Sequence, residues 1–156
     1  MSISLKTQIP AFAEQHATSD TAVSSDSLTG AFTVLYFYPK DNTSGCTTES
    51  QDFSRLYDEF VARNCQIFGV SRDSMKSHEN FKAKYDMPFE LISDPDETLC
   101  SLFDVMKMKN MYGKQVRGVE RSTFLIGPKG TLVAEWRKVK VPGHALEVLD
   151  TLKQQS

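Results

Sequence analysis

The sequence contains no apolar run of 18 residues and no basic segment followed by an apolar one near its start. A membrane-spanning helix needs about 20 apolar residues, so we expect neither a membrane anchor nor a secretory signal. Neither sign of charge is in excess, because 18 Lys and Arg oppose 20 Asp and Glu and the formal net charge is −2. Without a basic surplus to hold a phosphate backbone, nucleic acid is not an expected partner.

Cysteine and histidine are scarce, with three of each in 156 residues. Three cysteines are too few for a disulfide scaffold. No CxxC, HxxxH or HExxH pattern occurs, so we expect no metal site and no other cofactor. The cytoplasm is the expected location, and there a cysteine is a packing residue or a reactive group rather than half of a permanent disulfide.

The rest of the composition, 40% hydrophobic and 24% charged, is that of a globular protein, and we expect one domain over residues 1–156. Runs rich in aromatic and β-branched residues predict buried strands at 32–38, 66–70 and 89–92. Apolar stripes at helical spacing and turn signals predict helices at 47–63, 74–85 and 145–152. His78 is expected on the exposed side of the second of these helices.

The segment from Asp94 to Glu97 predicts a further helix, with Asp94 as N-cap and Pro95 as its first residue. Residues 106–118 are polar and predict a long loop. Residues 122–126 and 131–136 flank a Gly-Pro-Lys-Gly turn and predict a hairpin. Parallel strand–helix units followed by an antiparallel hairpin predict an α/β fold, with a mixed central sheet flanked by helices on both faces.

The loop from Pro39 to Cys46 follows the first buried strand and precedes a helix, which is the usual place for a site in an α/β sheet. Thr43 or Ser44 is the expected N-cap, and Cys46 then lies in the first helical turn. Unpaired backbone N–H groups and the helix dipole favour the nucleophilic thiolate there. A small buried hydrophobe at a helix start is the alternative interpretation of Cys46.

The pattern Pro39-x-x-x-Thr43-x-x-Cys46 resembles the active-site loop of peroxiredoxins. Residues 36–49 are most similar to the peroxiredoxin Q group, also called bacterioferritin comigratory proteins, although this group often carries proline where Ser44 stands. Residues 110–114 and 120–124 match the group as well, and the similarity extends from about Gly30 to the last helix. The resemblance implies a thioredoxin-like fold and an antioxidant thiol peroxidase that needs no metal, flavin or haem.

The resemblance also implies roles for four residues. Cys46 is the peroxidatic nucleophile, whose thiolate takes one oxygen from a peroxide and becomes a sulfenic acid. Thr43 supplies a hydroxyl that bonds thiolate and peroxide, and Pro39 shields the pocket. Arg121 supplies a charged donor that favours the thiolate and stabilises the leaving oxygen.

Two of the charged residues have a simpler interpretation. Arg121 is otherwise a surface partner of Glu120 or Glu49. Glu49 bonds either Arg121 or the loop backbone, or it is an ordinary acid in the first turn of a helix. The sequence leaves these alternatives open.

The sequence leaves open which thiol resolves the sulfenic acid. Many members of the group carry a second cysteine five residues after the first, where this chain has Gln51, and others carry it on the next helix, which has none here. Cys65 is expected to be a packing residue. Cys100 is either core or an intramolecular resolving cysteine. We favour a one-cysteine mechanism in which an external thiol of thioredoxin, glutaredoxin or glutathione type attacks Cys46.

Two other functions compete with a thiol peroxidase acting on hydrogen peroxide or organic hydroperoxides. A thioredoxin-like disulfide oxidoreductase needs a CxxC motif, but here the position of the second cysteine is occupied by Glu49. A redox sensor shares the reactive cysteine without requiring Thr43 and Arg121 together. Members of the resembled group are often monomeric, and we expect a monomer.

Overall fold

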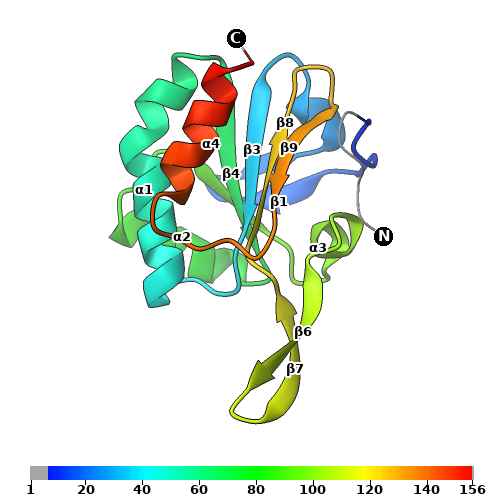
Figure 1. Cartoon of the computed structure of the whole chain (residues 1–156), viewed down its shortest axis with the longest axis vertical. Helices are drawn as coiled ribbons and strands as arrows, with labels where there is room; N and C mark the ends of the chain where they lie inside the picture. Colours follow the sequence, from blue (N-terminus) through cyan, green and yellow to red (C-terminus); the bar gives the residue numbers. More distant parts are fainter. Residues whose placement is uncertain (1–6, 156) are drawn as a thin grey trace.

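The computed structural model describes residues 7–155 (Figure 1). Its strands are β1 (Gln15–Ala17), β2 (Thr21–Val23), β3 (Phe32–Phe37), β4 (Cys65–Ser71), β5 (Glu90–Ser93), β6 (Met106–Met111), β7 (Lys114–Val119), β8 (Ser122–Ile126) and β9 (Leu132–Trp136). Its helices are α1 (Ser44–Val61), α2 (Met75–Lys84), α3 (Thr98–Leu102) and α4 (His144–Lys153), with a 3₁₀ turn, η1, at Ser25–Leu28.

Seven strands form the central sheet in the order β2-β1-β5-β4-β3-β8-β9. Strands β3, β4 and β5 run parallel, whereas β8 runs antiparallel to both β3 and β9. The mixed sheet is therefore the one predicted from the sequence. The central strands are apolar along most of their length because both of their faces are covered, as the fully buried strand β8 illustrates.

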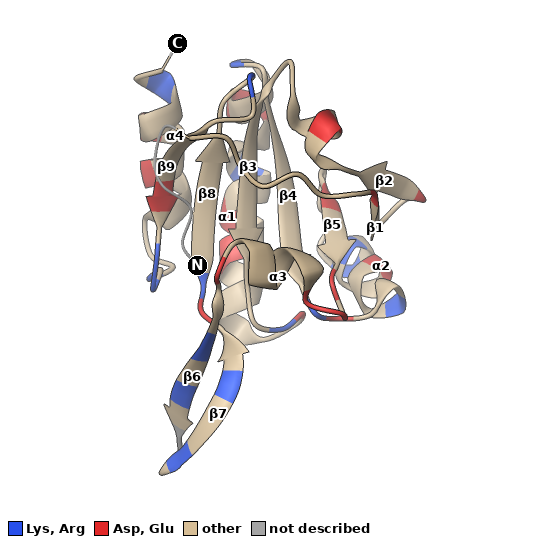
Figure 2. Cartoon of the chain, turned by 90° about the vertical axis from the view of Figure 1, so that its right-hand side faces the viewer, with Lys and Arg blue, Asp and Glu red and all other residues tan. Residues whose placement is uncertain are grey.

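The two faces of the sheet carry separate hydrophobic clusters. Along β3, Val34 and Tyr36 point into the cluster beneath α1 and α4, whereas Leu35 and Phe37 point into the cluster beneath α3. This alternation follows from the two-residue period of a strand. Figure 2 shows α3 in front of the sheet and α1 behind it. The prediction of helices on both faces is confirmed.

Helix α1 is held by its apolar face. Phe53 and Phe60 are fully buried against the sheet, and burial of a side chain of this size contributes roughly 1.5–3 kcal/mol. The helix begins seven positions after the end of β3, so its first turn stands at the carboxyl end of that strand. Within residues 7–155, no helix is both long enough and apolar enough to cross a membrane.

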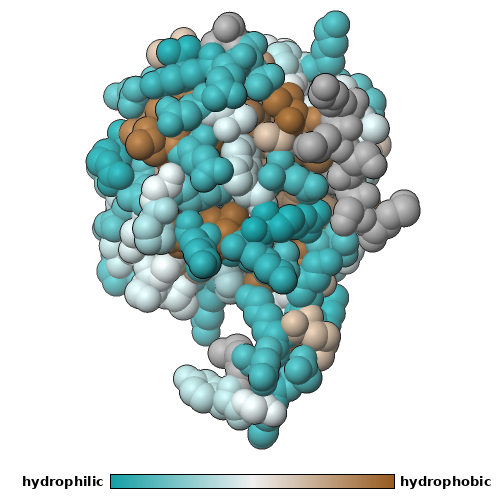
Figure 3. All heavy atoms as spheres, viewed as in Figure 1, coloured by the Kyte–Doolittle hydropathy of each residue, from teal (hydrophilic) through white to brown (hydrophobic). Residues whose placement is uncertain are grey.

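The predicted loop at 106–118 is wrong, because these residues form the hairpin β6–β7. Its turn is Tyr112-Gly113, and both residues have positive φ (53° and 79°), as a two-residue hairpin turn of type I′ requires. The hairpin is separate from the main sheet and projects beyond it (Figures 1 and 2). The ribbon is blue, the colour of lysine and arginine, at positions along both of its strands in Figure 2, and its surface is largely hydrophilic in Figure 3.

The predicted start of α3 is also wrong. The helix begins at Thr98, and its N-cap is Glu97, whose φ of 62° is left-handed. Asp94 does bind the first turn, but from outside the helix, since its carboxylate accepts from the N–H groups of Leu99 and Cys100 at 3.1 and 2.9 Å. The short pair β1–β2, which extends the sheet beside β5, was not predicted.

Candidate active site

Strand register places the loop before α1 next to Arg121. Phe37, the last residue of β3, pairs with Ser122, the first residue of β8. Arg121 precedes β8 and therefore stands at the same edge of the sheet as half-buried Pro39, which follows β3 after one residue. The carbonyl oxygen of Arg121 accepts from the N–H of Val139 at 3.0 Å, which fixes its backbone.

Thr43 is the N-cap residue of α1. It is one of the two residues predicted for this position. The first bond of the helix runs from the N–H of Thr47 to the carbonyl oxygen of Thr43 at 2.8 Å. The N–H groups of the three preceding positions, including Cys46, consequently have no partner within the helix. The Thr43 hydroxyl donates to the carbonyl oxygen of Lys40 at 2.9 Å rather than to sulfur. Its oxygen lone pairs are what it offers to an incoming group.

Cys46 and Arg121 are in direct contact. Cys46 is 1% exposed, and its Sγ lies 3.3 Å from Nη2 of Arg121, which donates to it. Gly45 makes room for this approach, because a Cβ there would stand only 3.2 Å from the same Nη2 atom. A guanidinium at this distance stabilises negative charge on sulfur. Arg121 therefore provides a charged hydrogen-bond donor directly to the Cys46 sulfur.

Glu49 lies one helical turn after Cys46 and accepts a hydrogen bond from Arg121. Its Oε1 accepts from Nη1 of Arg121 at 2.6 Å, and the carboxyl side chain is 1% exposed. Burial raises the pKa of Glu49 to about 7 against the opposing pull of Arg121. Its Oε2 atom has no hydrogen-bond partner among the residues described. Of the alternatives left open by the sequence, the structure selects the bond to Arg121, which therefore holds Glu49 and Cys46 with its two terminal nitrogens.

One further residue, not predicted from the sequence, acts electrostatically on Cys46 and Arg121. Lys109 on β6 is partly buried, and its pKa is lowered by that burial and by the charge of Arg121, while Cys46 acts in the opposite direction. Strand β6 therefore adds a cation to the electrostatic environment of Cys46. A segment predicted as a loop carried no signal for this placement.

The other two cysteines are remote from Cys46. Cys65 follows the far end of α1, which extends about 22 Å from Cys46 to Val61 at ~1.5 Å per residue. Cys100 belongs to the cluster on the opposite face of the sheet. Burial raises the pKa of Cys65 to about 12, and burial together with Asp94 raises that of Cys100 further. Both remain protonated thiols in the core at neutral pH.

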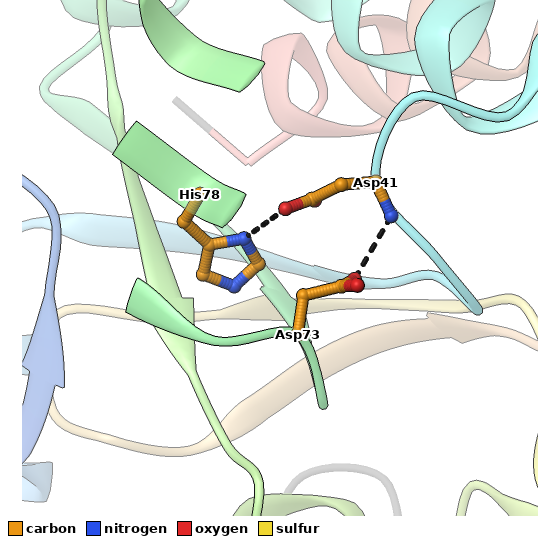
Figure 4. A group of neighbouring side chains, drawn as sticks. All are labelled: Asp41, Asp73 and His78. Carbon is orange, nitrogen blue, oxygen red and sulfur yellow. Dashed lines mark hydrogen bonds and ion pairs between the residues drawn. The ribbon is translucent and has the colours of Figure 1, made fainter. Parts of the chain in front are cut away.

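One group of side chains outside this site has the composition of a metal site. Ligand atoms of Asp41, Asp73 and His78 all lie within 4.8 Å of one another (Figure 4). Both ring nitrogens of His78 and both carboxylate oxygens of Asp41 already have protein hydrogen-bond partners. The prediction of an exposed His78 is wrong, because the side chain is fully buried against these groups.

Comparison with known proteins identifies the family. The profile described as the AhpC/TSA family matches residues 5–135. A peroxiredoxin Bcp of Xanthomonas campestris is 61% identical over 124 residues, which cover 80% of this chain and 78% of the relative. The chain is a peroxiredoxin. A peroxiredoxin Bcp of Bacillus subtilis is 50% identical over 127 residues, covering 81% of each chain.

Solved structures of this family share the fold of the peroxiredoxin described here. A structure of the Xanthomonas campestris bacterioferritin comigratory protein, described for its alkyl peroxide reduction activity, superimposes with a TM-score of 0.88 at 53% identity. The superposition covers 92% of this chain and 91% of the chain in that structure. The predicted thioredoxin-like fold and the predicted peroxiredoxin Q group are thereby confirmed, and the protein is a thiol peroxidase.

Proposed function

We propose that Cys46 is the peroxidatic nucleophile of a one-cysteine peroxiredoxin. The observation that carries this assignment is the 3.3 Å contact between its Sγ and Arg121, at the start of a helix whose first N–H groups lack helical partners. Arg121 favours the thiolate and stabilises the leaving oxygen. Thr43 offers its hydroxyl oxygen to the peroxide hydrogen, and Pro39 shields the pocket from one side.

The peroxide step is a displacement at oxygen. The thiolate sulfur of Cys46 attacks one peroxide oxygen, the O–O bond breaks, and the leaving oxygen takes up a proton to become water or an alcohol. Sulfur is oxidised to the sulfenic acid while the peroxide is reduced. Negative charge builds on the leaving oxygen, which explains why preformed donors at Arg121 and at the helix start lower the barrier.

An external thiol then resolves the sulfenic acid. It displaces hydroxide, which leaves as water, and forms a mixed disulfide that a second thiol reduces. Two facts support an external source. Cys65 stands beyond the far end of α1, and Cys100 packs on the opposite face of the sheet. A disulfide requires Cα atoms within about 7 Å, so neither residue reaches Cys46 without rearrangement of the core.

The substrates proposed are hydrogen peroxide and organic hydroperoxides, the second by likeness to the relative described for alkyl peroxide reduction. Thioredoxin-, glutaredoxin- or glutathione-type thiols are the proposed reductants. A cycle that draws on external thiols suits the reducing cytoplasm, where we place the enzyme. We further propose a single domain over residues 1–156 that acts as a monomer.

Mass spectrometry after one equivalent of hydrogen peroxide tests the mechanism. With glutathione present, we expect a mixed disulfide on the peptide that contains Cys46, and Cys46→Ser should abolish peroxide consumption. Cys65→Ser and Cys100→Ser should consume peroxide at the wild-type rate. An intramolecular bridge between Cys46 and Cys100 would overturn the one-cysteine mechanism and make Cys100 the resolving residue.

A further inference from the structure

A buried histidine joins helix α2 to the loop that leads into Cys46. His78 is 0% exposed. Its Nδ1 lies 2.7 Å from Oδ2 of Asp41, and its Nε2 lies 2.9 Å from the carbonyl oxygen of Ile92 on β5 (Figure 4). Asp41 stands in the middle of the loop between β3 and α1, five residues before the reactive cysteine.

Every polar atom of the two side chains has a hydrogen-bond partner. A carbonyl oxygen only accepts, so Nε2 of His78 carries a proton. Both oxygens of the Asp41 carboxylate accept from hydroxyl groups, Oδ1 from Tyr38 at 2.6 Å and Oδ2 from Ser77 at 2.8 Å. The Oδ2 atom also lies against Nδ1 of His78, so the imidazole links the Asp41 side chain to the backbone of β5.

The remaining attachments of the loop are weaker or more exposed. The backbone N–H of Asp41 donates to Oδ2 of Asp73 at 2.8 Å. The exposed side chain of Asn42 accepts from Tyr85 and Lys84 near the end of α2, at 3.2 and 3.3 Å. The Asp41 side chain is thus the buried point at which Ser77 and His78 of α2 bind the loop, and His78 in turn binds the backbone of β5.

We propose that His78 is a positioning residue for the peroxidase reaction, which fixes Asp41 and thereby holds the turn that carries Cys46 in its peroxide-reactive geometry. The proposal rests on the assignment of Cys46 as nucleophile. It also has a consequence for the second half of the cycle. An incoming thiol must reach a sulfur that is 1% exposed, so the turn has to open. The bond from His78 promotes the peroxide step and opposes the thiol step.

Two substitutions separate the contacts of the imidazole. In His78→Asn the amide nitrogen lies near the former Nδ1 and keeps the donor to Asp41, whereas in His78→Gln it lies near the former Nε2 and keeps the donor to Ile92. Stopped-flow measurements give the rate of Cys46 oxidation by hydrogen peroxide and, separately, the rate of reduction of the sulfenic acid by glutathione.

For His78→Gln we expect the peroxide rate to fall about 10-fold, because a small displacement of the reacting group is costly, and the glutathione rate to rise. His78→Asn should restore most of the peroxide rate. Ser74→Ala is the matched control. Ser74 caps α2 by accepting from the N–H of Ser77, and its side chain makes no hydrogen bond to the loop, so the substitution weakens the helix alone. It should leave both rates unchanged.

Equal losses in the two His78 variants, or peroxide and glutathione rates that fall together, would overturn the positioning role and indicate a structural one. Cys46→Ser in the same assay reports on the proposed function itself. Peroxide consumption by that variant would contradict the nucleophile assignment, whereas the Asn and Gln comparison bears on His78 alone.

Discussion

Nη2 of Arg121 lies 3.3 Å from Sγ of Cys46, although 75 positions separate the two residues in the sequence. The pairing of Phe37 with Ser122 creates this proximity, because it brings the residue before β8 to the end of β3. The reactive contact is therefore a product of sheet register. Any change that shifts β8 against β3 would separate the two groups without altering either side chain.

Arg121→Lys should lower the second-order rate of Cys46 oxidation by hydrogen peroxide by roughly 10²-fold, the loss typical of one preorganised donor. A lysine keeps the charge but does not bridge Glu49 and sulfur with two nitrogens. Stopped-flow peroxide consumption measures the effect. Arg117→Lys on the exposed hairpin is the control and should keep the wild-type rate. A wild-type rate in Arg121→Lys would show that charge alone suffices.

Gly45→Ala should lower the peroxide rate by about 10-fold while leaving the protein at least as stable. Alanine is a better helix former than glycine by about 1 kcal/mol. Its Cβ, however, would stand 3.2 Å from Nη2 of Arg121, whose other nitrogen is fixed by Glu49. Urea unfolding and stopped-flow kinetics on the same sample separate the two effects. A parallel loss of stability and rate would contradict this account.

Glu49 should make the stability of the protein depend on pH between about 4.5 and 7. Its folded-state pKa of about 7 lies above the ordinary value of 4.5 because of burial. The contribution of the protonated carboxyl is complete below pH 4.5 and is lost as the pH rises through 7. From pH 4.5 to 8, Glu49→Gln should gain on the order of 3 kcal/mol relative to wild type.

Urea denaturation at several pH values, with both proteins in a Cys46→Ser background, checks this dependence. The background removes ionisation of the reactive thiol from the comparison. Asp52→Asn is the control, since Asp52 lies on the same helix and pairs with Arg55 at the surface. A stability difference that is constant over this pH range would contradict the expected burial of the carboxylate.

Local patterns carried much of the fold and part of the site. The apolar segment at 32–38 and the polar loop after it placed Cys46 at a helix start, because strand burial and helix capping are decided by neighbouring residues. The role of Arg121 was predicted only from the resemblance to peroxiredoxins. Its contact with Cys46 depends on register between β3 and β8, which no periodicity within one segment encodes.

Long-range partners explain the errors. His78 is polar and lies on a helix, which favours exposure, but Asp41 stands 37 residues earlier and provides a buried hydrogen-bond partner. Residues 106–111 alternate between methionine and polar residues, and their polar content favoured a loop. The structure instead forms a hairpin, because Tyr112 adopts the positive φ that a tight turn requires. The start of α3 moved because Glu97 adopts a left-handed conformation that its neighbours do not reveal.

The central sheet separates Cys46 from Cys100, and the length of α1 separates it from Cys65. On the proposed one-cysteine mechanism, a sulfenic acid at Cys46 would therefore have no neighbouring thiol among the described residues that could react with it at a fixed effective concentration. A second peroxide, which would convert the sulfenic acid to sulfinic acid, would compete directly with free thiols in bulk solution. The ratio of peroxide to thiol around the enzyme would then determine how many turnovers each molecule completes before permanent inactivation.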